Sequence, residues 1–190
     1  MKSEIRLLGI DDAPFSFDQQ KSFIIGVVIR ATGYLEGVLK RDIDVDGKDA
    51  NNSFIDMINS SRHKNQIKAA LVDGVTFAGF NIINIEKIYQ KTNLPIITVT
   101  REKPNLDLIK TALQTHFSDW NNRYNVIADQ ILHRVETKHN DIFVNCAGVS
   151  IEEAKEIITL STIRGVIPEP IRIAHVIASG LRRGESHGKA

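Results

Sequence analysis

The sequence predicts a mixed α/β domain in which an antiparallel three-stranded meander is followed by alternating strands and helices. Three apolar runs fall within the first 45 residues, and the segments between them are too short for helices. Further along, short runs rich in β-branched residues alternate with segments whose apolar residues recur at helical spacing. The length of 190 residues, 42% of them hydrophobic and 25% charged, is typical of one globular domain and excludes disorder of the whole chain.

The meander is predicted at residues 5–10, 23–30 and 38–45. The first run, IRLLGI, is stopped by the sequence Asp-Asp-Ala-Pro. The second run is dense in β-branched side chains, and the third alternates apolar and polar residues in its second half. Because only a Gly-Tyr turn and a few flanking residues separate the last two runs, the three strands are expected to pair antiparallel.

The remaining elements are predicted from apolar runs typical of strands and from apolar residues at helical spacing. Pro104 fits the first turn of a helix, and Ser150 with Glu153 has the spacing of a capping box. Strands are expected at residues 67–72, 95–100 and 141–146, and helices at residues 51–61, 82–91, 104 onward, 151–160 and 168–181. A helix of several turns is expected within residues 117–138, from the positions of Trp120, Val126, Ile127, Ile131 and Val135.

This order of elements predicts a mixed central sheet with helices on both faces. Ribonuclease H-like folds have this order, and other mixed α/β folds share it. We find no repeat, low-complexity tract or linker, so residues 1–190 are expected to form one domain that ends in a polar tail at residues 182–190.

Composition excludes several classes of protein. Lys and Arg number 24 against 23 Asp and Glu, so a wholly basic nucleic-acid coat is excluded, although a local basic patch is not. Cys146 is the single cysteine, which excludes an intramolecular disulfide and predicts a small buried hydrophobe. No apolar run approaches the roughly 18 residues that span a bilayer, and the first residues lack a signal-peptide pattern. We expect a cytoplasmic protein with no membrane partner.

Acidic residues follow three of the predicted strands. Asp11 and Asp12 follow the first strand, Asp46 and Asp49 the third, and Asp73 the fourth. A rigid sheet can present such side chains at fixed separation, and carboxylates that converge there would need a hard cation such as Mg²⁺ between them. Aspartate after a strand also commonly caps a turn or a helix, so the spacing alone leaves a metal site and simple capping equally open.

The other motifs give weaker evidence of a functional site. Neither a GxGxxG nor a GxxxxGK loop occurs, and the six histidines contain no HxH or HxxxH pair, which argues against a zinc site. His175 lies on the last predicted helix with Glu169 and Arg172, each three residues from the next, so the three can share a face. Arg182 and Arg183 belong to a basic tail that could hold phosphates or simply be solvated.

Four segments together resemble a known family. They are LGIDDAPF at residues 8–15, VDGKD at 45–49, VDGVTFAGFN at 72–81 and PEPIRIAH at 168–175. The chain resembles, from about residue 5 to its C-terminus, an archaeal family long listed as uncharacterised that carries the name endonuclease dU. That family is distantly related to endonuclease V. The resemblance implies a ribonuclease H-like fold and Mg²⁺- or Mn²⁺-dependent cleavage of DNA at deaminated bases, notably deoxyuridine.

The resemblance also implies a set of metal ligands. Asp11 looks like the first-strand metal aspartate of endonuclease V, and Asp73 looks like its later one. Asp46 or Asp49 would replace a glutamate of that enzyme, and Asp46 is preferred because a glycine follows it. Arg101 falls where the relative has a lysine near the scissile phosphate, and arginine keeps the charge.

Base recognition carries over less well. The chain lacks the Pro-Tyr-Ile-Pro wedge of endonuclease V, and it lacks that enzyme's histidine-proline-arginine after the Asp-Gly loop. Phe77 or Phe80, in the loop after Asp73, could stack on an extruded base, or could pack in the core. Arg172 or His175 is expected beside the carboxylates, with a surface pair between Arg172 and Glu169 as the alternative.

The sequence thus predicts a metal-dependent endonuclease that acts on DNA with deaminated bases. Asp11, Asp46 and Asp73 would hold one or two Mg²⁺ or Mn²⁺ ions, and Arg101 would neutralise charge on the phosphate. Two alternatives stay open: a nucleic-acid-binding or regulatory module that kept the fold and lost turnover, and a nuclease that acts on RNA.

Overall fold

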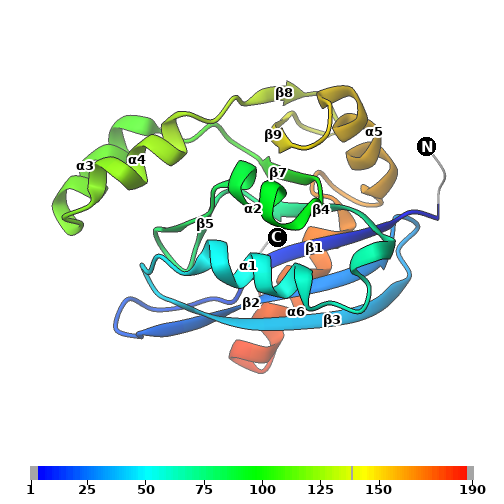
Figure 1. Cartoon of the computed structure of the whole chain (residues 1–190), viewed down its shortest axis with the longest axis horizontal. Coiled ribbons are helices and arrows are strands. Elements are labelled where there is room, and N and C mark those ends of the chain that lie inside the picture. Colours follow the sequence, from blue (N-terminus) through cyan, green and yellow to red (C-terminus); the bar gives the residue numbers. More distant parts are fainter. Residues whose placement is uncertain (1–3, 138, 188–190) are drawn as a thin grey trace.

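The computed structural model describes residues 4–137 and 139–187, and its described part contains one large sheet and one small hairpin (Figure 1). The strands are β1 (Arg6–Asp12), β2 (Lys21–Arg30), β3 (Leu35–Asp44), β4 (Ile67–Asp73), β5 (Thr76–Phe77), β6 (Asn81–Ile82), β7 (Ile96–Thr100), β8 (His133–Val135) and β9 (Ile142–Ala147). The helices are α1 (Ala50–Asn59), α2 (Ile85–Thr92), α3 (Leu106–His116), α4 (Trp120–Ala128), α5 (Ile151–Ser161) and α6 (Glu169–Arg183), with a short 3-10 turn at η1 (Lys64–Gln66).

The order of strands across the large sheet is β3-β2-β1-β4-β7-β9-β8. β1, β2 and β3 pair antiparallel, whereas β1, β4 and β7 run parallel to one another. β9 then pairs antiparallel with both β7 and β8. The predicted class, a mixed sheet with an antiparallel meander followed by parallel units, is confirmed.

Helices cover both faces of the sheet, as predicted. Side chains alternate along a strand, so Leu8 and Ile10 of β1 face one way and Leu7 faces the other. Leu8 and Ile10 join a core with side chains of α1, α2, α3 and α4, and Leu7 joins a core with α5 and α6. Figure 1 shows α1 in front of the meander and α6 behind it.

The predicted long helix within residues 117–138 is wrong in its second half. α4 ends at Ala128, and the chain then forms the strand β8. Val135 is buried because it pairs with Ile142 of β9, while Ile131 between the two elements is 69% exposed. The apolar spacing is compatible with a helix, but Val135 packs in the sheet and Ile131 is exposed to solvent. The hairpin of β5 and β6 was not predicted.

The ends of the other elements differ from prediction by a few residues. β2 begins at Lys21, and α6 extends to Arg183, so the first two residues of the predicted polar tail are helical. Ser150 caps α5 as predicted, since its side chain accepts a hydrogen bond from the backbone N–H of Glu153. The end of the tail, residues 188–190, lies outside the described residues. Among the described residues, no helix is both long enough and apolar enough to cross a membrane.

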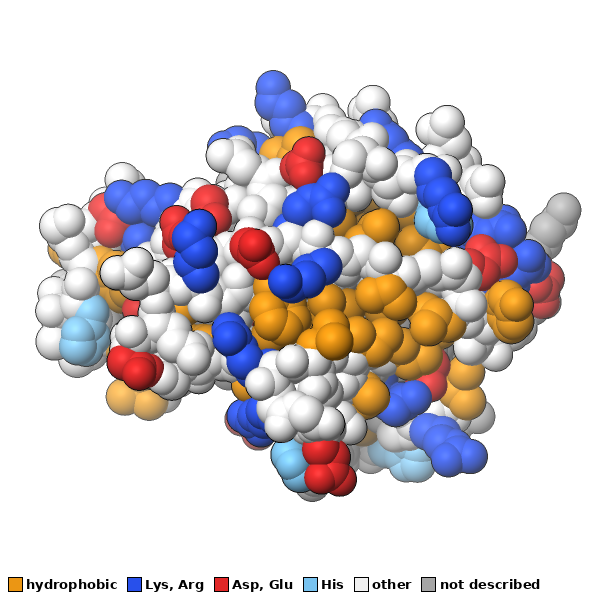
Figure 2. Space-filling view, turned by 90° about the horizontal axis from the view of Figure 1, so that it is seen from below, with side chains coloured by type: hydrophobic (Ala, Val, Ile, Leu, Met, Phe, Trp, Pro, Cys, Tyr) orange, Lys and Arg blue, Asp and Glu red, His pale blue; other side chains and the backbone are white. Residues whose placement is uncertain are grey.

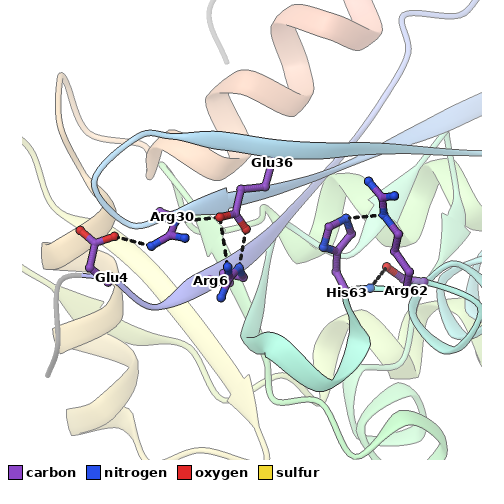
Figure 3. A network of polar contacts seen from close by, with 7 residues as sticks. Glu4, Arg6, Arg30, Glu36, Arg62 and His63 are labelled. Atoms are coloured by element: carbon purple, nitrogen blue, oxygen red, sulfur yellow. Dashed lines mark hydrogen bonds and ion pairs between the residues drawn. The ribbon is translucent and has the colours of Figure 1, made fainter.

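Ion pairs connect the three strands of the meander at the end where β1 begins. Arg6 and Arg30 lie directly opposite each other on β1 and β2, and their like charges would repel. Glu36 of β3 accepts hydrogen bonds from both guanidinium groups, and Arg30 also pairs with Glu4 (Figure 3). Both arginines hold the pKa of Glu36 below its usual range by hydrogen bonding. This charge cluster lies at the opposite end of β1 from its two aspartates, so it secures the strands without forming part of their site.

The outer edge of the sheet is β3. Leu35 and Val38 on this strand are 40% and 49% exposed, and no further strand of the described part pairs with β3 on its outer side. Seen from below, hydrophobic side chains gather on the face where the meander and α6 lie, with Lys and Arg side chains around them (Figure 2). Two cations lie over the ring of Phe23, namely Lys40 at 4.7 Å and Arg182 at 5.3 Å from its centroid.

The start of α6 packs tightly on β1 because Gly9 has no side chain. A Cβ atom at this position would lie 2.1 Å from the backbone carbonyl carbon and oxygen of Pro170. The helix therefore approaches the strand as closely as two backbones allow. This contact sets how far α6 lies from the end of β1.

Replacing Gly9 by Ala is expected to lower the free energy of unfolding by about 1–3 kcal/mol or more, because α6 must move away from β1. The measurement is urea denaturation followed by circular dichroism. Gly180→Ala is the matched control: it lies in the same helix, and the nearest atom to its added Cβ would be 3.9 Å away. That variant should be no less stable than the wild type, since Ala favours helix over Gly. Equal stability of both variants would contradict the tight contact at Gly9.

Candidate active site

Three parallel strands end at the same edge of the sheet with ionisable side chains on the same face. Leu71 of β4 and Val99 of β7 both belong to the core under α5 and α6. Since side chains alternate, Asp73 and Arg101, each two residues further along, lie on that same face. Ile10 pairs with Val72, which places Asp11 beside Asp73 on the neighbouring strand. The sheet thus brings Asp11 and Asp73 together, and Arg101 directly follows the neighbouring strand β7.

Helix α6 supplies a fourth group to this cluster. His175 lies one turn and a half beyond the start of the helix, and its Nδ1 is 2.8 Å from Oδ2 of Asp11. This hydrogen bond, more than any other interaction, raises the pKa of His175 above its ordinary value. The negative charges of Asp11 and Asp73 raise the pKa further, while burial opposes the rise. A cationic His175 would therefore hold Asp11 in one orientation.

These groups line a pocket of about 350 Å³. Asp11, Asp12, Asp73 and His175 form its polar wall, and the chain that follows β1 forms another part of the rim, through Ala13, Pro14 and Phe15. Arg183, the last residue of α6, lies exposed at the pocket, and no side chain or backbone group in the described part of the chain pairs with it. The pocket therefore places three carboxyl groups beside an unpaired cation.

Two carboxyl groups in this pocket, those of Asp73 and Asp12, have raised pKa values. Burial raises the pKa of Asp73 to about 6, and the charge of Asp11 adds to the rise, while Arg101 and His175 oppose it. Burial likewise raises the pKa of Asp12 to about 7, with Asp11 again adding to the rise. Each additional negative charge in the pocket is thus costly. A cation among these carboxylates would lower that cost.

The donor set fits a divalent cation that takes oxygen ligands. Among the described residues, no group of three or more Asp, Glu, His and Cys side chains is already arranged to hold an ion. Mg²⁺ does not require such a cage, since it is typically bound by one or two carboxylates with water and substrate phosphate. Two buried polar atoms that lack a hydrogen-bond partner within the described part, Thr100 Oγ1 and His175 Nε2, lie at this end of the sheet. Asp11 and Asp73, with Asp12 beside them, are the residues that could hold Mg²⁺.

The structure does not bring Asp46 or Asp49 into this pocket. Oδ1 of Asp46 accepts a hydrogen bond of 2.7 Å from the backbone N–H of Phe80. Both carboxylate oxygens of Asp49 accept from the backbone N–H of Asp44, and one also accepts from Asn81. Both aspartates are therefore engaged in holding turns, which is the alternative that the sequence left open. Asp12 lines the pocket, and Oδ2 of its carboxylate also accepts a hydrogen bond of 2.6 Å from the backbone N–H of Ala78.

A buried arginine fixes the loop that carries Asp46. Arg123 of α4 is only 8% exposed, and its guanidinium donates hydrogen bonds to the backbone carbonyls of Asp46, Gly47 and Phe80. It also pairs with Asp119 and lies over the ring of Phe117, 4.3 Å from its centroid. No local pattern of residues indicates this role, because Arg123 is distant in the chain from the loops that it binds.

The two phenylalanines predicted to stack on a base are both engaged in packing. Phe77 is 1% exposed and meets the ring of Phe54 edge-on at 4.9 Å between centroids. Phe80 packs against the same core and meets Phe117 edge-on at 5.7 Å. The described structure therefore supports the alternative of core packing for both residues.

Arg172 and Cys146 take the structural roles that the sequence allowed. Nε of Arg172 lies 2.8 Å from a carboxylate oxygen of Glu169, and this pair lies outside the carboxylate pocket. The Sγ atom of Cys146 lies 3.4 Å from the carbonyl of Val149, and burial raises the pKa of the thiol, which disfavours the thiolate. Sequence reasoning did not find Phe15 or Arg183 at the pocket, although both lie in segments that it had singled out.

Comparison with known proteins places the chain in a family. The family model described as "Endonuclease dU" matches residues 3–182. A protein described as "UPF0215 protein" from Methanothermobacter thermautotrophicus is 46% identical over 193 aligned positions, which cover 100% of this chain and 94% of that protein. The resemblance stated from the sequence motifs is confirmed.

Solved structures extend the comparison to the fold. A protein of unknown function from Archaeoglobus fulgidus has a TM-score of 0.83 at 35% identity, covering 94% of this chain and 98% of that chain. Human endonuclease V has a TM-score of 0.60 at 15% identity, covering 92% of this chain and 83% of that chain. The ribonuclease H-like class predicted from the order of strands is confirmed. With the family model matching nearly the whole sequence, the chain belongs to the endonuclease dU family.

Proposed function

We propose that this protein is a metal-dependent endonuclease that hydrolyses a phosphodiester bond in DNA at deaminated bases such as deoxyuridine. The observation that carries the proposal is the pair of Asp11 and Asp73. They extend from adjacent parallel strands into one pocket, where burial and mutual repulsion raise the pKa of Asp73. A pocket that holds carboxylates together, although their burial and mutual repulsion are unfavourable, is typical of a functional site.

The pocket residues have distinct roles in the proposed reaction. Asp11 and Asp73 would hold Mg²⁺ or Mn²⁺, and Asp12 is the third carboxyl group within the same pocket. When bound, the cation supplies Lewis-acid stabilisation of charge on the phosphate and activation of water. His175 orients Asp11 through the 2.8 Å contact of its Nδ1.

Two arginines would bind the phosphate group. Arg101 is close enough to Asp73 to lower the pKa of its carboxyl, so its guanidinium lies beside the pocket. Arg183 lies at the pocket rim and has no partner within the described part of the chain. A guanidinium binds phosphate oxygens in pairs, which would fix the phosphorus relative to the two aspartates.

Cleavage of a labelled oligonucleotide panel tests this proposal. The panel carries uracil, hypoxanthine, xanthine or no lesion at one position, in DNA and in RNA, with Mg²⁺, Mn²⁺ or EDTA. We expect cleavage of the uracil-containing DNA that requires the divalent cation. Binding without cleavage under all these conditions would support the non-catalytic alternative, and cleavage confined to the RNA series would support the RNA-directed one.

Replacing Arg172 by Ala is expected to leave cleavage unchanged. The side chain pairs with Glu169 outside the pocket and is 42% exposed, so the loss of the pair should cost under about 1 kcal/mol in stability. The measurement is the cleavage rate of uracil-containing DNA together with the melting temperature. His175→Ala, three residues along the same helix, is the counterpart that should lose activity. A loss of cleavage in Arg172→Ala with an unchanged melting temperature would place Arg172 in the site.

A further inference from the structure

The loop that joins β1 to β2, residues 13–20, presents an exposed aromatic side chain beside the carboxylate pocket. Phe17 is 78% exposed, more than any other large hydrophobic side chain in the described part of the protein. Its ring meets that of Phe15 edge-on, with 5.3 Å between centroids and an interplanar angle of 86°. Phe15 in turn lines the pocket. Packing within the domain does not account for a phenylalanine in this position.

The β1–β2 loop is held in place at both ends. The backbone N–H of Ala13 donates to the carbonyl of Phe23, and the hydroxyl of Ser22 donates back to the carbonyl of Ala13. Nε of Arg182, from α6, donates to the carbonyl of Pro14 at 3.0 Å. A turn between Ser16 and Gln19 closes the tip. Because Asp11 and Asp12 precede the loop directly, its aromatic rings keep a fixed position relative to the carboxylates.

Three cations lie around the loop, against one exposed acidic side chain, Asp18, within it. Arg183 lines the pocket without a partner within the described part, and Arg182 lies at the base of the β1–β2 loop. Lys40 and Arg182 both lie over the ring of Phe23, next to the strand that leaves the loop. Cations interleaved with aromatic rings are the pattern by which proteins bind single-stranded nucleic acid, with phosphates on the cations and bases on the rings.

We infer that Phe17, supported by Phe15, is the platform on which a nucleobase next to the scissile phosphate stacks. Arg183 is the cation that holds a phosphate of the same strand. This inference rests on the proposed function and adds to it the residue that contacts the base. It assigns the contact with the base to the β1–β2 loop, because Phe77 and Phe80 pack against the core.

The test measures binding of a fluorescein-labelled single-stranded DNA that contains uracil, by anisotropy in EDTA so that no cleavage intervenes. We expect Phe17→Ala to weaken binding by about 5- to 150-fold, the range for the loss of one stacked base. Phe17→Trp should bind at least as tightly as the wild type. Ile163→Ala is the matched control, because Ile163 is a half-exposed hydrophobic residue beside the β2–β3 turn, at the opposite end of β2.

An abasic scan identifies the contact itself. Each nucleotide of the same DNA is replaced in turn by an abasic site, and the change in affinity is measured for the wild type and for Phe17→Ala. At the stacked position, removal of the base should weaken wild-type binding and leave binding by the variant unchanged, because both changes remove one interaction. Equal losses at every position in the two proteins would overturn the inference while the proposed function stands. Absence of DNA binding by the wild type, together with no cleavage in the oligonucleotide panel with Mg²⁺ or Mn²⁺, would overturn both.

Discussion

Replacing Asp73 by Asn is expected to reduce divalent-dependent cleavage by at least about 10²- to 10³-fold, the typical cost of losing one essential electrostatic group in an active site. Asn keeps the size of Asp and one acceptor oxygen, but it lacks the negative charge that binds a hard cation. The measurement is the single-turnover rate on uracil-containing DNA at saturating Mg²⁺. The variant should stay folded, because the change removes a buried carboxyl group that repels Asp11.

The control for this variant is Asp42→Asn. Asp42 lies on β3, its side chain is 67% exposed, and it pairs with Lys40 away from the pocket. This change removes the same charge from the protein without touching the carboxylate cluster, so cleavage should be unchanged. An Asp73→Asn protein that cleaves at the wild-type rate would contradict the assignment of Asp73 to the metal.

The stability of the metal-free protein is expected to fall as the pH rises from about 4 to about 7. The folded-state pKa values of Asp12 and Asp73, about 7 and about 6, lie above the ordinary value of 3.8. The folded state thus binds protons more tightly than the unfolded state in this window, and the stabilisation present below pH 4 is lost as the pH passes through the two folded-state values. His175, whose pKa is also raised, acts in the same direction. The total effect is on the order of a few kcal/mol.

Melting temperatures in EDTA across this pH range measure the effect. A change of 1 kcal/mol corresponds to about 2–4 °C for a chain of this length. Addition of Mg²⁺ at pH 7–8 should raise the melting temperature, because the cation binds the ionised carboxylates of the folded state only. Asp73→Asn should weaken both the pH dependence and the response to Mg²⁺. A melting temperature that rises steadily from pH 4 to pH 7 in EDTA would contradict the raised pKa values.

The amino-acid sequence by itself was sufficient for most of the strands along the chain and for the strand ends at which carboxylates lie. Alternation and β-branched runs are local signals, so β1, β4 and β7 could be recognised from the residues that compose them. Asp11 is the next-to-last residue of β1, Asp73 is the last residue of β4, and Arg101 directly follows β7. Parallel neighbours bring such ends together, so the nearness of Asp11 and Asp73 could be expected from the strands that carry them, whereas the place of Arg101 was implied by the resemblance.

Other features depended on contacts between residues far apart in the chain. Asp46 and Asp12 both follow predicted strands, and no local signal separates them. Both carboxylates accept a backbone hydrogen bond from the loop after β4, that of Asp12 from Ala78 at 2.6 Å and that of Asp46 from Phe80 at 2.7 Å. The structure separates them because Asp12 also lines the pocket, whereas Asp46 does not. In the same way, Val135 belongs to a strand because Ile142 lies opposite it.

The aromatic residues show the same division most clearly. Phe77, Phe80 and Phe17 are chemically identical, and each lies near an aspartate of the site in the sequence. Only the tertiary structure decided that Phe77 fills the space against Phe54 while Phe17 stays in solvent. The physical reason is that the burial of a side chain depends on which other helices and strands pack around it. The sequence of a loop specifies which side chains it carries, and the packing around that loop determines which of them remain free to meet a substrate.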